Sequence, residues 1–392
     1  RKASGRSAAG AAWTFNYYAD LADGFEWQEQ RTPAAGGQVG LVVREPVGVV
    51  GVIIPWNAPL AMIANKLAPA LIAGCTIVLK ASPEAPGAAY IVAEIAEEIG
   101  LPKGVLNVLT ADRDVSELLV RSTNIDKITF TGSTAAGRRI ASLCGNRIAR
   151  CTLELGGKSA AVILDDFDIG LAAKTIAGPA VFLAGQVCSS LTRIIVTHDR
   201  HDQLVDALSA AFSHIRVGDP FDPTTHMGPL ATARQRDRVE GYITRGIEEG
   251  AKLAQGGKRP ANLNRGFFIE PTIFGNVDNN STIAREEIFG PVLSVIPVDN
   301  EEQAVKTAND TIYGLNASVF TNDIDRAYEV ARQLQSGTVG HNCFRTDSTM
   351  GFGGFKQSGI GREGGIEGLY PYIESKAVIL EGTPNHMIAN PK

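Results

Sequence analysis

The sequence predicts an α/β protein with doubly wound parallel sheets, and three observations support this prediction. Residues 47–54 (VGVVGVII) form a continuous apolar run, as expected of a strand covered on both faces of its sheet. From this run onward, strand-like and helix-like segments alternate, which indicates parallel βαβ units. The 392 residues, 44% hydrophobic and 20% charged, are enough for two or three domains, each with its own core.

The first alternating series begins at residue 47. Before it, residues 8–24 have a helical pattern and residues 38–45 alternate like an exposed strand. Within the series we expect strands at 47–54, 76–79, 105–109 and 127–130, and helices at 59–72, 86–99, 114–121 and from 134. This succession is typical of a nucleotide-binding architecture.

A second alternating series follows Gly157. We expect strands at 159–164, 193–197, 293–297 and 317–320, and helices at 168–183, 201–214, 229–249, 300–308 and 324–335. We therefore predict a domain boundary near Gly156 and Gly157. Small-molecule sites usually form in clefts between domains, so this boundary is where we expect a site.

Charge and cysteine usage argue against several classes of protein. The net charge of −5 and the lack of a basic run make nucleic acid and anionic membranes poor partner candidates. The five cysteines are scattered without a Cys-x-x-Cys pair, which argues against a disulfide framework and a metal site and favours a reducing, cytoplasmic location.

Neither of the two longest uncharged stretches reads as a membrane span. Prolines and polar residues interrupt both residues 46–65 and residues 175–192. The chain opens on Arg1 without a secretory leader, so we expect a fragment or a chain whose early residues are missing.

Cys188 is the candidate nucleophile. It lies in GQVCSS (185–190), among small and polar residues, and Glu154 precedes a Gly-Gly turn that would bring a carboxylate close. A lone cysteine is more often a small buried hydrophobe, so this pair alone does not decide between the two readings. None of the six histidines stands in a recognisable partner motif, which disfavours a cysteine hydrolase.

Three strand ends carry candidate ligand-binding residues. The turn FTGSTAAG (130–137) places Gly132, Ser133 and Gly137 at the start of a helix, where an anion is favoured, although Ser133 would equally serve as a helix cap. Lys80 ends a strand and precedes Glu84; both side chains suit ribose hydroxyls, and a solvated strand end is the alternative.

The Asn57 amide suits an oxyanion hole, and a turn-forming asparagine is the alternative. Two further loops, residues 285–291 and 351–359, combine glycines, polar residues and aromatics and are too long for simple turns.

Taken together, these motifs resemble the aldehyde dehydrogenase superfamily in their order and spacing. The resemblance runs from about residue 45 to about residue 376 and rests on PWN at 55–57, Lys80, FTGST at 130–134, ELGGK at 154–158, GQVC at 185–188, EEIFGP at 286–291 and Asn342. It implies a Rossmann-like cofactor domain (1–27 and 47–156), a catalytic α/β domain (157–358) and a small oligomerisation strand arm (28–46 and 374–384). About a hundred residues that would normally begin the cofactor domain are expected to be missing.

The resemblance also implies roles for individual residues. Cys188 would be the nucleophile, Glu154 the general base, Asn57 with the Cys188 amide the oxyanion hole, and Lys66 a proton relay. Cofactor binding would involve Trp56, Lys80, Glu84, Gly132, Ser133, Gly137, Leu155, Glu287 and Phe289. The substrate pocket would involve Ala58, Met62, Phe182, Val187, Phe344 and Phe352, which are mostly apolar.

The resemblance implies NAD as cofactor, with NADP as the alternative. The usual Lys-Pro-x-Glu is here Lys-Ala-Ser-Pro-Glu (80–84), so the acid that favours an unphosphorylated ribose comes one residue late. Glu154 favours a hydrolytic enzyme over a coenzyme-A-acylating one, because the latter typically lacks a base at that position.

We therefore expect oxidation of a medium-sized aliphatic or aromatic aldehyde to a carboxylic acid, through a thiohemiacetal and a thioester on Cys188. The alternative is a non-catalytic binding or structural member of the same fold. Pairing of the 38–44 strand and the segment near 373–380 with another subunit implies a homodimer or homotetramer.

Overall fold

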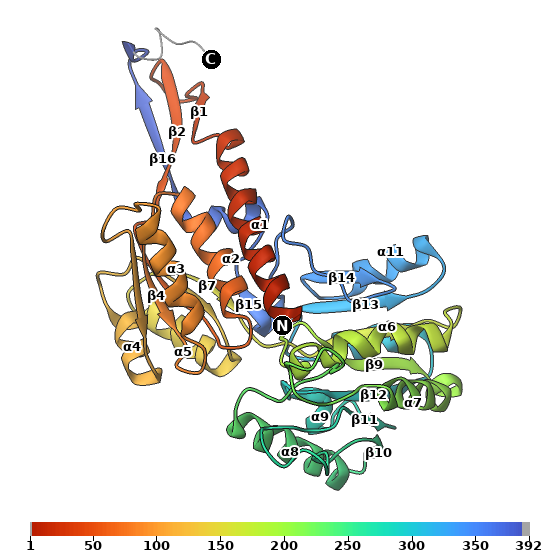
Figure 1. The fold of residues 1–392 in the computed structure, drawn as a ribbon. Coiled ribbons are helices and arrows are strands. Elements are labelled where there is room, and N and C mark those ends of the chain that lie inside the picture. Colours follow the sequence, from red (N-terminus) through yellow and green to blue (C-terminus); the bar gives the residue numbers. More distant parts are fainter. Residues whose placement is uncertain (1, 386–392) are drawn as a thin grey trace.

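A computed structural model shows three separate β-sheets joined by helices and loops (Figure 1). It describes residues 2–385, with side chains from residue 7 onward; residues 386–392 and Arg1, the first residue of the expected cofactor domain, lie outside the described residues. Two of the sheets are mostly parallel and flanked by helices, so the predicted α/β fold class is confirmed.

The first parallel sheet has six strands in the order β15-β7-β6-β3-β4-β5. All neighbouring pairs are parallel except β15 with β7. Its strands are β3 (Val49–Ile53), β4 (Thr76–Ala81), β5 (Leu106–Thr110), β6 (Lys127–Thr131), β7 (Arg150–Glu154) and β15 (Gly359–Ile360). The accompanying helices are α2 (Pro59–Ile72), α3 (Gly87–Glu98), α4 (Arg113–Arg121) and α5 (Thr134–Gly145), with α1 (Lys2–Gly24) packed along α2.

The second sheet has seven strands in the order β10-β11-β12-β9-β8-β13-β14. Only the edge strand β10 is antiparallel to its neighbour. The strands are β8 (Ser159–Ile163), β9 (Leu191–Thr197), β10 (Lys252–Gln255), β11 (Thr272–Gly275), β12 (Val292–Val298), β13 (Asn316–Phe320) and β14 (Thr338–His341). The helices of this part are α6 (Ile169–Val181), α7 (His198–Ser213), α8 (Ala233–Glu248), α9 (Thr282–Arg285), α10 (Glu301–Asn309) and α11 (Ile324–Gln333).

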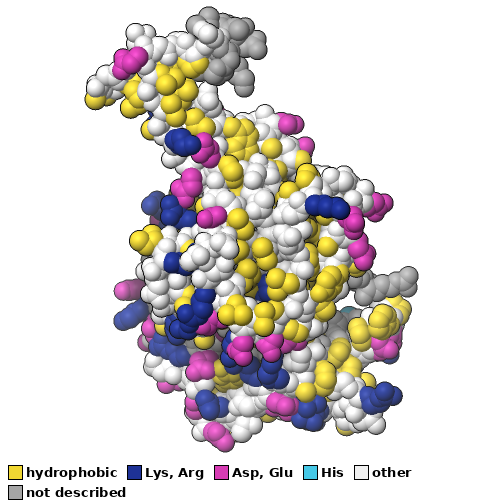
Figure 2. Space-filling model, turned by 90° about the vertical axis from the view of Figure 1, so that its left-hand side faces the viewer, with side chains coloured by type: hydrophobic (Ala, Val, Ile, Leu, Met, Phe, Trp, Pro, Cys, Tyr) yellow, Lys and Arg dark blue, Asp and Glu magenta, His cyan; other side chains and the backbone are white. Residues whose placement is uncertain are grey.

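The third sheet is a three-stranded antiparallel arm that projects away from the rest of the molecule (Figure 1). It consists of β1 (Gln28–Arg31), β2 (Val39–Pro46) and β16 (Ile373–Leu380), so a strand from near the C-terminal end of the described chain pairs with one that follows α1. Hydrophobic side chains gather on the arm, whereas acidic and basic side chains are interspersed over the visible face of the body (Figure 2). Among residues 2–385, no helix is both long and apolar enough to cross a membrane.

Most predicted elements lie within a few residues of the observed ones. The predicted helix 168–183 ends at Val181, because Leu183 and Ala184 adopt left-handed backbone conformations. Strands β1, β7, β10, β11, β14 and β15 and helix α9 were not predicted. The division of the chain into cofactor domain, catalytic domain and arm stays a prediction.

A chain reversal at Asn342 returns the polypeptide to the edge of the seven-stranded sheet where Cys188 lies. Asn342 is left-handed (φ 57°), and its amide pairs twice with the backbone of Thr321 (2.9 Å each). The chain then runs back along β13, where Ser318 donates to the Cys343 carbonyl and Asn316 to the Arg345 carbonyl (2.9 Å each).

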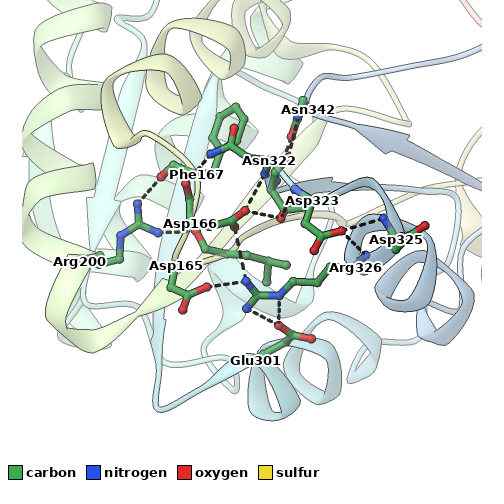
Figure 3. A network of polar contacts seen from close by, with 12 residues as sticks. Asp165, Asp166, Phe167, Arg200, Glu301, Asn322, Asp323, Asp325, Arg326 and Asn342 are labelled. Atoms are coloured by element: carbon green, nitrogen blue, oxygen red, sulfur yellow. Dashed lines mark hydrogen bonds and ion pairs between the residues drawn. The ribbon is translucent and has the colours of Figure 1, made fainter.

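A polar network stabilises the carboxyl edge of the seven-stranded sheet, where Asn342 follows β14 (Figure 3). Asp166 accepts from Thr321 and from the backbone of Asn322, both at 2.7 Å, and Arg326 contacts Asp165 at 2.7 Å and Glu301. Asn342 therefore serves a structural role at the reversal, because its side-chain amide is used by Thr321.

Candidate active site

Four of the predicted site residues lie at the carboxyl edge of the six-stranded sheet. Asn57 follows β3, Lys80 lies near the end of β4, Ser133 follows β6 and Glu154 ends β7. Because these strands are parallel, their carboxyl ends meet at one edge. This edge is the expected place for a ligand in an open α/β sheet.

Two further predicted residues, Cys188 and Glu287, lie at the amino edge of the seven-stranded sheet. Cys188 precedes β9, and Glu287 precedes β12. The glycines between β7 and β8 join the two edges: Gly157 donates its N–H to Glu287 Oε1 at 3.0 Å, and a Cβ on Gly157 would overlap the Cys188 carbonyl. The Gly156-Gly157 turn therefore has to be free of side chains, because it lies directly between Cys188 and Glu287.

The Cys188 loop also contacts the six-stranded side. Asn57 Nδ2 donates to the carbonyl of Gln186, two residues before Cys188, at 2.9 Å, so the Asn57 amide lies beside the Cys188 loop. An amide nitrogen has two N–H groups, so one remains available for a substrate oxygen. Cys188 itself is partly exposed, unlike the fully buried Cys75 and Cys144.

The surroundings of the Cys188 thiol disfavour its thiolate form. Burial, followed by the negative charges of Glu287 and Glu154, raises the pKa of Cys188 to about 12. Burial has the largest effect because it removes the solvation that a thiolate needs, and the two carboxylates add electrostatic repulsion. Thiolate formation therefore requires a proton acceptor beside Cys188.

Glu154 has a buried carboxyl group that no hydrogen bond holds within residues 2–385. Its side chain is 3% exposed, and within residues 2–385 neither carboxyl oxygen has a hydrogen-bond partner. Burial and the neighbouring Glu363 raise its pKa well above the ordinary value, while Lys66 and Arg362 act in the opposite direction. A carboxylate with a raised pKa is a stronger proton acceptor than an ordinary one, which suits a general base.

Lys66 forms a buried ion pair with Glu363, a residue that the sequence reasoning missed. The two side chains are 0% and 4% exposed, and Lys66 Nζ also lies 3.4 Å from Thr129 Oγ1. Glu363 stands between glycines in the run GREGG (361–365), and a lone carboxylate in a glycine-rich loop is the signal that would have found it. The pair lies close enough to Glu154 to influence its charge.

A groove of about 690 Å³ runs along the carboxyl edge of the six-stranded sheet. Lys80 lines it, is only 8% exposed and has its pKa lowered by burial. Ser133 lines it too, and caps α5 by accepting from the Ala136 N–H at 3.3 Å, so the capping reading is correct and the helix start still faces the groove. Such a groove is large enough for a nucleotide and offers both a cation and a helix N-terminus.

Glu84 lies in the same groove but already has partners. It accepts from Ser82 and forms an ion pair with Arg234 at 2.9 Å. Arg234 lies on α8, a helix that accompanies the seven-stranded sheet, and it was not predicted as a site residue. A ribose hydroxyl at Glu84 would therefore compete with Arg234 for the carboxylate.

The other end of the predicted cofactor site is a cradle around Glu287. Burial raises the pKa of Glu287 to about 7, while the Gly157 N–H, Arg238 and Lys158 lower it. The Trp56 and Phe289 rings meet edge to face, with their centroids 5.5 Å apart. Leu155 is buried and packs against Gly137, and Gly132 lies against the Phe130 ring, where a Cβ on either glycine would overlap these side chains.

The predicted substrate-pocket residues differ in location and in exposure to solvent. Val187 is partly exposed beside Cys188, and Phe182 is 47% exposed in the same loop. Phe352 exchanges two backbone hydrogen bonds with Glu363 (2.6 and 2.8 Å) and so lies on the Glu154 side. Met62 packs against the core of the six-stranded sheet and Phe344 against that of the seven-stranded sheet.

Comparison with known proteins agrees with this geometry. A model of the aldehyde dehydrogenase family matches residues 1–378. Geranial dehydrogenase from Castellaniella defragrans is 47% identical over 366 residues, which cover 93% of this chain and 76% of that enzyme.

Solved structures agree as well. A Mycobacterium tuberculosis aldehyde dehydrogenase complexed with NAD+ has a TM-score of 0.92 at 48% identity, covering 95% of this chain and 76% of that one. Aldehyde dehydrogenase C from Pseudomonas syringae, complexed with NAD+ and octanal, has a TM-score of 0.92 at 38% identity, covering 97% and 77%. The protein therefore belongs to the aldehyde dehydrogenase family and is an oxidoreductase that acts on aldehydes.

Proposed function

We propose that this protein oxidises an aldehyde to a carboxylic acid with NAD+ as hydride acceptor, using Cys188 as the nucleophile. The observation that carries the proposal is the convergence of Cys188, Asn57 and Glu154 around the Gly156-Gly157 turn. A thiol, an amide donor and a carboxyl group with a raised pKa are the three groups that oxidation through a thioester requires.

The first step is attack of the Cys188 sulfur on the aldehyde carbon. Because the pKa of the thiol is raised, its proton needs a nearby acceptor. Glu154 is the candidate, since it is one of the two carboxylates whose charge raises the pKa of Cys188. The carbonyl oxygen becomes an oxyanion, which the free N–H of Asn57 and the Cys188 backbone N–H would stabilise. Removing one such donor typically costs ~100-fold or more in rate.

NAD+, when bound, supplies the nicotinamide ring that accepts the hydride from the thiohemiacetal, which becomes a thioester. The groove with Lys80 and Ser133 suits the adenosine and phosphate part, and Glu287 beside Trp56 and Phe289 suits the nicotinamide ribose and ring. NAD+ is also the ligand of the M. tuberculosis and P. syringae relatives.

The second half of the reaction is hydrolysis of the thioester. Glu154 takes a proton from water, the resulting hydroxide adds to the thioester carbon, and the Cys188 sulfur leaves. Before each such step Glu154 must lose the proton it holds. The Lys66–Glu363 pair, buried beside Glu154, is the proposed route for that proton.

We propose a medium-sized apolar aldehyde as substrate. Phe182, Val187 and Phe352 offer apolar walls, and the relatives act on geranial or were crystallised with octanal. A panel of linear, branched and aromatic aldehydes, ranked by kcat/KM, tests this choice. A preference for small, charged or phosphorylated aldehydes would contradict it.

The function itself is tested by formation of reduced nicotinamide with aldehyde and NAD+. Cys188→Ala should abolish it, whereas Cys343→Ala, which alters another partly exposed cysteine, should retain it. Retained activity in Cys188→Ala would contradict the assignment. A wild-type protein that binds NAD+ but shows no reduction with any aldehyde would favour the non-catalytic alternative.

We also propose that copies of the chain associate through the arm into a homodimer or homotetramer. The edge strands β1 and β16 have no further neighbour among the described residues, and Ile379 on β16 is 62% exposed. Light scattering of the wild type and of Ile379→Lys tests this proposal. An Ile379→Lys variant with unchanged mass would argue against the β16 edge.

A further inference from the structure

We propose that Gln186 is a positioning residue that holds the nucleophile loop in a strained conformation. The inference rests on the proposed roles of Cys188 and Asn57. It starts from the backbone immediately before Cys188, where Leu183 (φ 50°, ψ 32°), Ala184 (φ 55°, ψ 38°) and Gly185 (φ 71°) are all left-handed.

Three consecutive left-handed residues are unfavourable when two of them carry a Cβ. Such a conformation persists only where surrounding contacts over-determine it. Gly185 is required here, because a Cβ would overlap the backbone of Gly290. Leu183 and Ala184 have no such freedom, so other contacts must hold them.

Gln186 provides those contacts from a buried position. It is 5% exposed, and its Nε2 donates to the Leu183 carbonyl at 2.8 Å, across the strained turn. Its Oε1 accepts from the Ala231 N–H at 3.0 Å, at the start of the segment that leads into α8. The Gln186 backbone N–H also donates to the Leu183 carbonyl, at 3.2 Å, so the side chain adds a second bond across the turn and anchors it to a second element.

We call the two side-chain hydrogen bonds of Gln186, to Leu183 and to Ala231, the Gln186 clamp. The backbone of Gln186 connects this clamp to the proposed oxyanion donor. The Gln186 carbonyl accepts from Asn57 Nδ2 at 2.9 Å, and this bond orients the Asn57 amide. One residue thus places both the loop that carries Cys188 and the amide proposed to bind the oxyanion. Neither the Gln186 side chain nor its carbonyl has to touch the substrate for this role.

The chemistry of the clamp allows a pH-dependent test. Gln186 needs one donor towards Leu183 and one acceptor towards Ala231. A protonated glutamic acid offers the same pair, an O–H and a C=O, whereas an ionised one offers only acceptors and faces the Leu183 carbonyl. Gln186→Glu should therefore form the clamp when protonated and lose it as the pH rises.

The experiment compares Gln186→Glu, Gln186→Met and the control Gln333→Glu with wild type. Gln333 is exposed on α11 and donates to the Glu329 carbonyl at 3.1 Å, so its change to Glu is the same chemistry far from the site. Two readouts are measured across pH: kcat/KM for an aldehyde, and the rate of Cys188 alkylation by iodoacetamide, followed by peptide mass spectrometry.

Gln186→Met should lower kcat/KM about tenfold or more at every pH, mainly through kcat, since two hydrogen bonds are lost. Gln186→Glu should approach wild type at acid pH and fall to the Gln186→Met level through one extra ionisation. The ratio of its alkylation rate to that of wild type should change with the same ionisation, and NAD+ affinity should stay unchanged.

A Gln186→Glu ratio that stays flat across pH, or a Gln186→Met enzyme with wild-type kcat, would overturn the proposal. Because Gln186→Glu is compared with itself at two protonation states, a folding defect would lower both states and is distinguished. Alkylation needs neither aldehyde nor NAD+, so the clamp is still tested if the wild type oxidises no aldehyde, an outcome that contradicts only the proposed function.

Discussion

Lys66→Met is expected to destabilise the protein strongly, because Lys66 forms a fully buried ion pair with Glu363. The two side chains are 0% and 4% exposed, so water cannot replace the lost partner. Breaking a buried pair by removing one member typically costs about 3–5 kcal/mol. The corresponding loss for Arg121→Met, which breaks an exposed pair with Glu117, should be about 0–1 kcal/mol.

The double variant Lys66→Met/Glu363→Leu separates the pair from its surroundings. If the single variant suffers from an unpaired buried carboxylate, then replacing both members by apolar side chains should recover more than half of the lost stability. Urea unfolding, followed by far-ultraviolet circular dichroism, measures all four proteins. A free energy of unfolding for Lys66→Met within about 1 kcal/mol of the wild-type value would refute the reasoning, since the smallest expected loss is about 3 kcal/mol.

The same substitution has a defined effect on pH dependence. Lys66 is the charge that most lowers the Glu154 pKa, so its loss raises that pKa further. A base works only when deprotonated, and the acidic limb of the steady-state rate should therefore move to higher pH in Lys66→Met. A limb that stays in place would show that Glu154 does not control turnover.

Three further predictions concern single groups of the site. Glu154→Gln should keep a burst of cofactor reduction and lose turnover. Because burial raises the folded-state pKa of Glu154, this residue favours folding most below its ordinary pKa of about 4.3 and loses that contribution as the pH rises. The variant should therefore also be more stable than wild type at neutral and alkaline pH in urea unfolding. Gly157→Ala should abolish activity and lower the free energy of unfolding by about 1–3 kcal/mol, because its Cβ would overlap the Cys188 carbonyl. The control Gly241→Ala, in open space on α8, should raise the free energy of unfolding by about 0.5–1 kcal/mol. Lys80→Met should weaken NAD+ binding about tenfold or more by calorimetry, since a charged hydrogen bond is lost, while Lys103→Met, at an exposed position, should not change it.

The local pattern was sufficient for much of the fold. Helix α2 and the strands β3, β4 and β6 were predicted almost at their observed bounds, because each has its own apolar periodicity and a glycine or proline at its end. The missed strands are short or lie in polar, glycine-rich stretches; β11, for instance, has only four residues and follows a long irregular segment. Their strand conformation depends on neighbouring strands more than on their own composition.

The sequence by itself determined the α/β class, the alternation of strands and helices, and the residue types for thioester chemistry, since motif order along the chain carries this information. Only the tertiary structure decided how those residues are charged and held. Lys66 and Glu363 are 297 positions apart, yet both lie in one buried cluster with Glu154, and the raised pKa values of Cys188 and Glu154 arise from this packing. Desolvation and charge proximity depend on distances in space, and sequence spacing does not encode them.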